Sequence, residues 1–435
     1  MKVSDLTLQL LSGMTMLKHQ AQDWLLDKTL GWPEQPVINK IDTHHHMVPD
    51  FYAKVVAENG GDPSGWPTPD WSPTASKLLM KRVGVRSAIL SVSAPGACIA
   101  KESAEQQDLA RRLNEYAAAL RNNDPAFGFF ASLPDIRNAT TAIEEINYAL
   151  DHLNADGVTL FTRYGPGNTY LGHADLEPVW AELNRRGAVV FVHPTHPVDT
   201  TLVNPHMLQP IIDYPHETTR AAMDMIMSQT LQKYPNVKVI LSHAGGTLPY
   251  LITRLATSLK KTPDFVAKWK TGTTYEDAMS SFRRFYYDTA LSSAPQVLST
   301  LSAMVPHDHI LFGSDFPYAP ATAYSAFLEE LEQADIASEL REKINFGNAE
   351  KLIPRLARDV STGESTAEKP AESLAESQAE SQAETQAETQ AATQAETQAE
   401  TQAESTAESQ AEGTAESQAE STAESPVKGE SVSES

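Results

Sequence analysis

The stretch KIDTHHHMVP, residues 40–49, joins a strand pattern to three consecutive histidines. Apolar and polar side chains alternate up to the histidines, and Pro49 then ends the pattern. On a strand, His44 and His46 point to one face and His45 points to the other. The stretch alone leaves open whether these side chains bind a metal or are solvated in a loop, so the rest of the chain has to supply partners.

Seven further short β-rich runs follow, and helical patterns lie between several of them. The eight runs cover residues 40–46, 87–93, 127–133, 157–163, 188–193, 237–243, 284–290 and 310–315. Eight strands joined by helical crossovers are typical of a (β/α)8 TIM barrel, which is the α/β fold that we predict. A doubly wound open sheet is the alternative, but no glycine-rich dinucleotide loop follows the first run.

Two segments flank the predicted barrel, which we place at residues 40–358. Residues 1–39 carry apolar side chains at helical spacing, so we expect an amphipathic helix that packs on the barrel or on a second subunit. A helix on a membrane surface is the alternative. Residues 359–435 form an array of AESQ and AETQ repeats with almost no large apolar side chains, which predicts a disordered low-complexity tail.

The composition limits the classes of partner. The chain has 435 residues and a formal net charge of -23, much of it after Ser361, so no basic face is available for nucleic acid. No run is long enough to cross a bilayer. The single cysteine, Cys98, excludes an internal disulfide and fits a reducing compartment. We therefore expect a cytosolic protein without a nucleic-acid partner or a transmembrane segment.

Five side chains suited to metal or proton chemistry fall at the ends of predicted strands, where barrels place their active sites. His44 and His46 end the first strand, His193 the fifth, His243 the sixth and Asp315 the eighth. Each alone could be structural: a hydrogen-bonded histidine, or an aspartate that caps a turn. Together, three imidazoles and a carboxylate match the ligands of zinc and similar ions, so we predict one divalent metal on His44, His46, His193 and Asp315.

We assign His243 to proton transfer or substrate polarisation rather than to metal binding. Gly245 and Gly246 follow it and let the backbone pass close to the site. The helix predicted after them would present its N-terminus to the same place. His45, on the opposite face of its strand, is expected to point toward the surrounding helices.

Several motifs resemble the metal-dependent decarboxylase branch of the amidohydrolase superfamily, which includes aminocarboxymuconate-semialdehyde and γ-resorcylate decarboxylases. The motifs are IDTHHHMVP, FVHP, YPHETTRAAMDMIMSQTLQKYPNVKVILSHAGGTLPYLITR and ILFGSDFPY, in that order. The segments GGDPSGWPTPDWS and SAPGAC are most similar to the group in this branch that acts on 6-methylsalicylate in fungal polyketide pathways. The resemblance covers residues 40–355.

The resemblance implies a homodimeric carboxy-lyase with Zn²⁺, or alternatively Mn²⁺, on the four predicted ligands, and with His243 and Asp315 as catalytic residues. It implies non-oxidative decarboxylation of a small hydroxybenzoate, most directly of 6-methylsalicylate to m-cresol and CO2. The aminocarboxymuconate enzyme takes an arginine from its neighbouring subunit. That arginine would align near Thr262, where this chain has none, which favours a monocarboxylate substrate here. A metal-dependent hydrolase of a lactone, amide or ester is the alternative on the same barrel.

Other residues are candidates for contact with a substrate or for orienting the site. Arg254 and His196 could bind a substrate carboxylate or phenol, although each could equally be a surface residue. Asp288 ends the seventh predicted strand and could orient a site residue or simply begin a loop. Cys98 is expected to be a small packing residue. Four aromatic residues could line a pocket or belong to the core: Trp66, Trp71, Tyr164 and Phe316.

Overall fold

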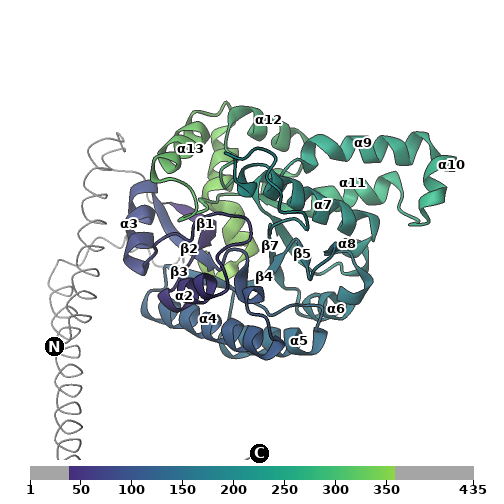
Figure 1. Ribbon diagram of the computed structural model, residues 1–435. Coiled ribbons are helices and arrows are strands. Elements are labelled where there is room, and N and C mark those ends of the chain that lie inside the picture. The colour runs from purple at the N-terminus through teal and green to yellow at the C-terminus, as the bar shows by residue number, and fades with distance from the viewer. Residues whose placement is uncertain (1–38, 358–435) are drawn as a thin grey trace, which may run out of the picture. The chain divides into compact units, whose positions relative to one another are not determined.

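The computed structural model describes residues 39–357. The helix predicted over residues 1–39 and the tail predicted over residues 359–435 lie outside the described residues, apart from Asn39. Within them the predicted barrel is present: eight parallel strands form one sheet in the order β1-β2-β3-β4-β7-β8-β9-β10. Figure 1 shows the strands at the centre and the helices around them.

Each strand falls in or overlaps one of the predicted β-rich runs. The strands are β1 (Lys40–His46), β2 (Val85–Ser91), β3 (Phe127–Ala131), β4 (Gly157–Phe161), β7 (Val189–His193), β8 (Lys238–Leu241), β9 (Tyr286–Asp288) and β10 (Ile310–Leu311). Two short strands, β5 (Arg163–Tyr164) and β6 (Thr169–Tyr170), form a separate antiparallel pair. Strands β4 and β7 are buried along their whole length, as expected of a sheet covered on both faces.

The barrel closes between β1 and the segment that follows β10. The backbone N–H of Thr43 donates to the carbonyl oxygen of Phe312, and a parallel bridge joins His45 to Phe316. The N–H groups of Ser314 and Asp315 both donate to the carbonyl oxygen of His44. These bonds bring the end of the last strand against the end of the first.

Apolar side chains fill the inside of the barrel below this closure. The inner core contains Ile41, Ile89, Phe130, Phe191, Ile240 and Leu311, one from each of six strands. Filling by bulky side chains makes the barrel a packed core, so only its carboxyl end can hold ligands. The ring of Phe191 packs edge-on against His44 with a centroid separation of 4.9 Å, which sets the floor of the site.

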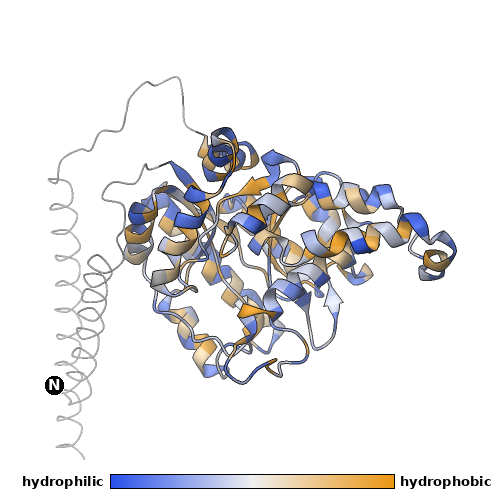
Figure 2. Cartoon of the chain, turned by 90° about the horizontal axis from the view of Figure 1, so that it is seen from above, coloured by the Kyte–Doolittle hydropathy of each residue, from blue (hydrophilic) through white to orange (hydrophobic). Residues whose placement is uncertain are grey.

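Helices cover the outer face of the sheet. The longer ones are α3 (Pro73–Val83), α4 (Ser103–Asn123), α6 (Glu177–Arg186), α7 (Asp213–Met227), α9 (Leu248–Lys261), α11 (Tyr275–Arg284), α12 (Pro295–Met304) and α13 (Ala321–Gln333). Hydrophobic and hydrophilic residues alternate along these helices in Figure 2, as expected when one side of each helix is buried. Within the described range, no helix combines the length and the apolar character needed to span a membrane.

Helices α9 and α10 (Pro263–Val266) extend away from the barrel as an arm, which Figure 1 shows at the right. The arm carries large apolar side chains on its surface: the exposed fractions are 82% for Tyr250 and 56% for Phe265. Phe265 also packs edge-on against Trp269, which is itself 37% exposed. These side chains are not explained by the core of the barrel.

Candidate metal centre and active site

Four of the predicted site residues meet at the carboxyl end of the barrel. His44 and His46 end β1, His193 ends β7, and Asp315 lies in the loop after β10. All four are buried, and one ligand atom from each lies within 4.8 Å of the others. Nε2 of His44 is 3.0 Å from Nε2 of His46. Oδ1 of Asp315 lies 3.2 Å from the first of these nitrogens and 3.1 Å from the second.

The second ring nitrogen of each histidine is held by an acceptor. Nδ1 of His44 lies 2.9 Å from Oδ2 of Asp288, and Nδ1 of His193 lies 2.7 Å from its neighbour's carbonyl oxygen. Nδ1 of His46 lies 2.9 Å from Oγ of Ser91 and 3.3 Å from the carbonyl oxygen of the same residue. Carboxylates and carbonyls only accept hydrogen bonds, so Nδ1 carries the hydrogen and Nε2 keeps its lone pair in the neutral ring.

This arrangement fits a divalent cation. Three nitrogen lone pairs and a carboxylate oxygen face one another in a buried space, where they repel unless a positive charge lies between them. Three imidazoles with one carboxylate are a donor set that zinc and manganese accept. The predicted ligands can therefore hold a metal without any rearrangement of their hydrogen-bonding partners.

The electrostatics of the four residues give the same picture. Burial lowers the pKa of His44, but the carboxylates of Asp288 and Asp315 more than offset this and raise it to about 10. Burial lowers the pKa of His46, and burial together with the neighbouring histidines holds that of His193 well below its usual value. Burial would raise the pKa of Asp315, but His44 and His46 hold it well below its usual range. A proton on His44 thus occupies the place that a metal would take.

His243 stands beside the four residues, half-buried, in a tight turn after β8. Its ring lies 4.9 Å from that of His44, and its Nδ1 lies 3.0 Å from the carbonyl oxygen of Ala290. Nδ1 is therefore the donor, which leaves Nε2 free to take up or deliver a proton. The backbone N–H of His243 donates to Oδ1 of Asp288 at 3.0 Å. Asp288 thus orients two site histidines, the role that its strand-end position predicts.

His45 points away from the site, as predicted, and belongs to a buried brace that we define as Asp42, His45, Ser76 and Ser314. Oδ2 of Asp42 lies 2.9 Å from Nδ1 of His45 and accepts from Oγ of Ser314 at 2.6 Å. Oδ1 of Asp42 accepts from the backbone N–H groups of His44 and Ser314. Nε2 of His45 lies 2.9 Å from Oγ of Ser76 on α3. The brace therefore ties the segment before Asp315 to the strand that carries His44 and His46.

Asp315 needs this support because its backbone φ is 62°, a left-handed conformation that is unfavourable for a residue other than glycine. Its N–H is bonded to the carbonyl oxygen of His44, and the next residue's N–H donates to Oγ of Ser314. The sequence predicts the ligand but not this conformation, which exists because the surrounding bonds fix the chain on both sides.

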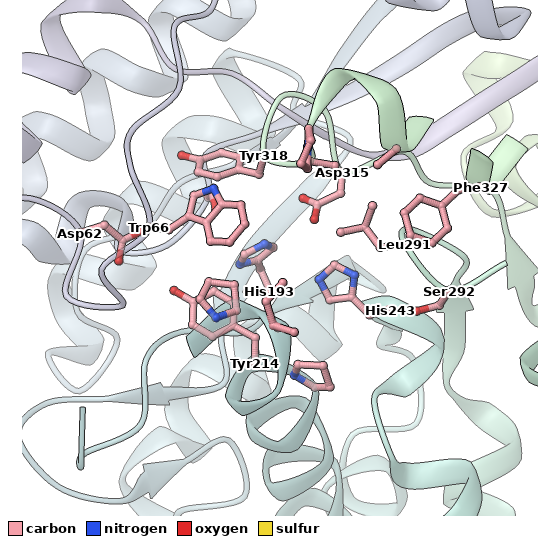
Figure 3. A pocket seen from close by; sticks show the side chains of 17 residues that line it. Asp62, Trp66, His193, Tyr214, His243, Leu291, Ser292, Asp315, Tyr318 and Phe327 are labelled. Carbon is pink, nitrogen blue, oxygen red and sulfur yellow. The ribbon is translucent and has the colours of Figure 1, made fainter. Parts of the chain in front are cut away.

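A cavity of about 390 Å³ opens above the metal centre. It is lined by Asp62, Trp66, Ser93, His193, Pro210, Ile211, Tyr214, Pro215, His243, Leu291, Ser292, Asp315, Tyr318, Ala319, Pro320, Ala323 and Phe327. Figure 3 shows Asp62, Trp66 and Tyr214 on one side and Leu291 and Phe327 on the other, with His193 and Asp315 between them. Lysine and arginine are absent from these described lining residues.

Several candidates for substrate contact lie elsewhere. Arg254 is exposed on α9 and does not line the cavity. His196 is partly buried in the loop after β7, where burial and Arg163 lower its pKa to about 4, and it too is absent from the lining. Of the four aromatic candidates only Trp66 lines the cavity; Trp71, Tyr164 and Phe316 pack elsewhere. Cys98 packs against the core, and burial raises the pKa of its thiol.

Sequence reasoning missed most of the cavity wall. Asp62, Tyr214, Leu291, Tyr318 and Phe327 come from five separate segments, and each lies in a loop or at one position of a helix. No periodicity singles out such positions, because only the closed barrel brings them together. A signal was available only for Leu291 and Tyr318, which come shortly after predicted strands, and for Tyr214, which lies at the start of a helix.

A barrel with three histidines and an aspartate at its carboxyl end defines a class of metal-binding barrel proteins. Residues 41–355 match the amidohydrolase family, and the chain belongs to this family.

Two fungal relatives are similar over most of the barrel. A 6-methylsalicylic acid decarboxylase of Penicillium expansum is 49% identical over 318 residues, which cover 73% of this chain and 97% of the relative. One of Aspergillus aculeatus is 48% identical over 329 residues, which cover 74% and 98%. Among solved structures, a dihydroxybenzoic acid decarboxylase from Polaromonas sp., with bound manganese and the inhibitor 2-nitroresorcinol, has a TM-score of 0.62 at 22% identity. It covers 74% of this chain and 98% of its own, and shows the same fold.

Proposed function

We propose that this protein is a metal-dependent carboxy-lyase that converts 6-methylsalicylate to m-cresol and CO2, in polyketide secondary metabolism. The observation that carries the proposal is the buried centre of three histidines and an aspartate beneath a single-ring cavity, in a chain 49% identical to a 6-methylsalicylic acid decarboxylase. A hydrolase would use the same kind of centre, but the relatives favour the lyase.

His44, His46, His193 and Asp315 would hold the metal, and we propose Zn²⁺ first because three neutral imidazoles suit it, with Mn²⁺ as the second choice. A divalent cation there would supply Lewis-acid stabilisation of the carboxylate and phenolate oxygens of the substrate. Because no lysine or arginine is among the described residues that line the cavity, the metal centre would be the main positive group for a substrate carboxylate.

The cavity suits one aromatic ring with a small apolar substituent. Its volume of about 390 Å³ lies near the lower end of ligand pockets in general. Leu291 and Phe327 present an apolar wall beside the centre, where a methyl group on the ring would be buried. This wall supports 6-methylsalicylate over a more polar or a larger hydroxybenzoate.

The residues of the site would manage one proton per turnover. A proton is added to the ring carbon that carries the carboxylate; the C–C bond then breaks, its electron pair restores the aromatic ring, and CO2 leaves. Asp315 begins as a carboxylate, since its pKa is held well below the usual range by His44 and His46 against the effect of burial. It must therefore gain a proton before it can deliver one. We propose that Nε2 of His243, which is free, first takes up a proton from solvent and then passes it to Asp315.

The test is purification with metal analysis, followed by measurement of CO2 above a solution of enzyme and 6-methylsalicylate. In D2O we expect one deuterium in m-cresol, at the ring carbon between the hydroxyl and the methyl group. A hydrolase would instead place solvent oxygen in its product. Full metal occupancy with no CO2 from any hydroxybenzoate would contradict the proposal.

We also propose a homodimer in the cytosol. The exposed aromatic side chains Tyr250 and Phe265 on the arm, and Trp269 just after it, favour a covering protein surface. A second copy of the chain would provide one. The single cysteine fits a reducing compartment. Sedimentation of the purified protein tests the oligomer: a monomer at micromolar concentration would rule out the dimer.

A further inference from the structure

We infer that Asp62 and Tyr214 form a hydrogen-bonding subsite for a further hydroxyl group on the substrate ring, so that the enzyme also takes ring-hydroxylated salicylates. This inference rests on the proposed function, because it concerns the same cavity and the same reaction. It adds a class of substrate that 6-methylsalicylate does not represent.

The hydroxyl of Tyr214 is the first observation. The side chain is buried, and its ring lies 6.4 Å from that of His193, so it stands beside the metal centre. Its oxygen is buried and has no hydrogen-bond partner among the described residues. The side chain of Ser64 lies near this oxygen, but not in hydrogen-bonding geometry. A buried hydroxyl without a partner is unfavourable, and a polar group on a ligand would remove that cost.

The carboxyl group of Asp62 is the second, independent observation. It lines the same cavity, and Figure 3 shows it on the same side as Tyr214. Its Oδ1 accepts one hydrogen bond, from the backbone N–H of Ser64 at 2.8 Å. Carboxylate oxygens accept more than one hydrogen bond each, so the group retains capacity to accept from a ligand hydroxyl. Burial raises the pKa of this carboxyl group.

The opposite wall of the cavity is apolar. Leu291 and Phe327 lie across from Asp62 and Tyr214, with the metal centre between the two walls. A ring over the centre would therefore face an apolar wall on one edge and a polar wall on the other. In 6-methylsalicylate the carboxylate and phenol would lie at the metal and the methyl group at the apolar wall. The polar wall would then be unused, unless the ring carries another hydroxyl.

The neighbouring phenol of Tyr318 is not part of this subsite. Its ring packs edge-on against His46 at 5.3 Å, and the side chain of Ser93, which is a lining residue, lies near its hydroxyl. The hydroxyl of Tyr214 is buried without a partner among the described residues, whereas that of Tyr318 is not such a group. The groups on this wall that can form a hydrogen bond with a ligand are therefore Tyr214 and Asp62. The hydroxyl of Tyr214 can donate or accept, and the carboxylate of Asp62 can accept.

The experiment compares 6-methylsalicylate with three analogues that carry an extra hydroxyl at ring position 3, 4 or 5. The full-length, metal-loaded enzyme is assayed as wild type, Tyr214→Phe and Asp62→Asn. Tyr148→Phe and Asp175→Asn are the matched controls. Asp175 is solvent-exposed, and Tyr148 is partly exposed far along the chain from the cavity lining, with its hydroxyl bonded to Glu115. Circular dichroism and metal content establish that each variant is folded and loaded.

We expect the wild type to decarboxylate at least one analogue. The quantity compared is the ratio of kcat/KM for that analogue to kcat/KM for 6-methylsalicylate. Tyr214→Phe should lower this ratio by about tenfold, because it removes a hydrogen bond to the added hydroxyl alone. Asp62→Asn should lower the same ratio by less, because the amide oxygen still accepts. The two controls should leave the ratio unchanged.

Three results would overturn the inference. Wild type that releases CO2 from 6-methylsalicylate but from none of the analogues overturns it and leaves the proposed function standing. An equal loss of kcat/KM for 6-methylsalicylate and for the analogue in Tyr214→Phe would mean that Tyr214 contacts a group that both substrates carry. That result also overturns the inference. If no substrate is turned over, the proposed function fails. The subsite is then decided by titrating the metal-loaded protein with m-cresol and its hydroxylated analogues, and equal affinities for wild type and Tyr214→Phe overturn it.

Discussion

At the scale of single residues, the ring of His44 lies between two carboxylates, which favour a positive charge there, either a proton or a metal ion. Its Nδ1 faces Asp288 and its Nε2 faces Asp315, and together these carboxylates outweigh burial and raise its pKa to about 10. Below that pH the ring of His44 in the metal-free protein carries a second proton, on Nε2. A metal must displace this proton in order to bind Nε2.

The first prediction concerns this exchange. Metal binding should release about one proton from His44, so the apparent affinity should rise about tenfold per pH unit through the neutral range and level off near the pKa of His44. Calorimetric titration in buffers of different ionisation enthalpy measures the number of protons. A metal that binds with no proton released would show that His44 is already deprotonated in the metal-free site.

The second prediction separates the two kinds of site histidine. His193→Ala should lose most of the bound metal and all measurable turnover, because it removes a buried donor of the metal centre. His243→Ala should keep most of the metal and lose turnover by about a hundredfold or more, as expected for a proton-transfer group. Metal analysis beside the CO2 assay distinguishes the two. A fully active His243→Ala would show that another group handles the proton.

The centre could be predicted from the sequence at this scale, but the cavity could not. His44, His46 and His193 lie at the ends of strands. Because successive side chains on a strand point to opposite faces, the sequence predicts the face on which each histidine lies. Tyr214 and Phe327 lie on different helices, and their meeting depends on loops whose course no pattern specifies. Arg254 lies close to His243 in the sequence, yet its helix directs it outward.

At the scale of elements, strands β8 and β10 are shorter than the runs that predict them. Strand β10 ends at Leu311, and the chain then leaves β9 to bond with β1 through Phe312, Ser314 and Asp315. The alternation of side chains predicts an extended run as far as Asp315, but not which neighbour its backbone will bond to. The brace on Asp42 is the structural reason for this change of partner.

The third prediction tests the brace. Ser314→Ala removes the 2.6 Å hydrogen bond to Asp42 and the bond from the N–H of Phe316, so Asp315 loses support for its left-handed backbone. We expect a free energy of unfolding lower by about 1–3 kcal/mol and a metal affinity lower by about tenfold or more. Thermal unfolding and metal competition with a chelator measure the two effects.

The control for this prediction is Ser302→Ala, in which the lost hydroxyl bonds only to the carbonyl oxygen of Ser299 on the same helix. It should change neither quantity by a comparable amount. Equal effects from the two variants would mean that the Ser314 hydroxyl does not position Asp315.

At the scale of the whole molecule, we propose that residues 40–358 form the catalytic unit and that residues 1–39 and 359–435 are a helical extension and a low-complexity tail. The similarity to the Penicillium relative supports this: 73% of this chain accounts for 97% of that protein. Outside the barrel, the repeats of the tail contain almost no large apolar side chains that could form a core around a site.

The fourth prediction follows from this division. A protein that ends after Arg358 should keep its metal, its thermal unfolding temperature and its kcat/KM for 6-methylsalicylate within about twofold, because the described site lies wholly within residues 42–327. Full-length protein prepared in parallel is the comparison. A loss of turnover with the metal retained would assign the tail a part in the reaction.

Asp288 gives the site a constraint on how it can evolve. One oxygen of this side chain holds the ring of His44, and the other holds the backbone of His243. A mutation of Asp288 that altered the preference for a cation would also change the position of His243, so metal binding and proton transfer would change in a single step. Ser91 touches the ring of only one predicted ligand, His46, and lineages that adapt to a different ion should therefore accumulate replacements there first.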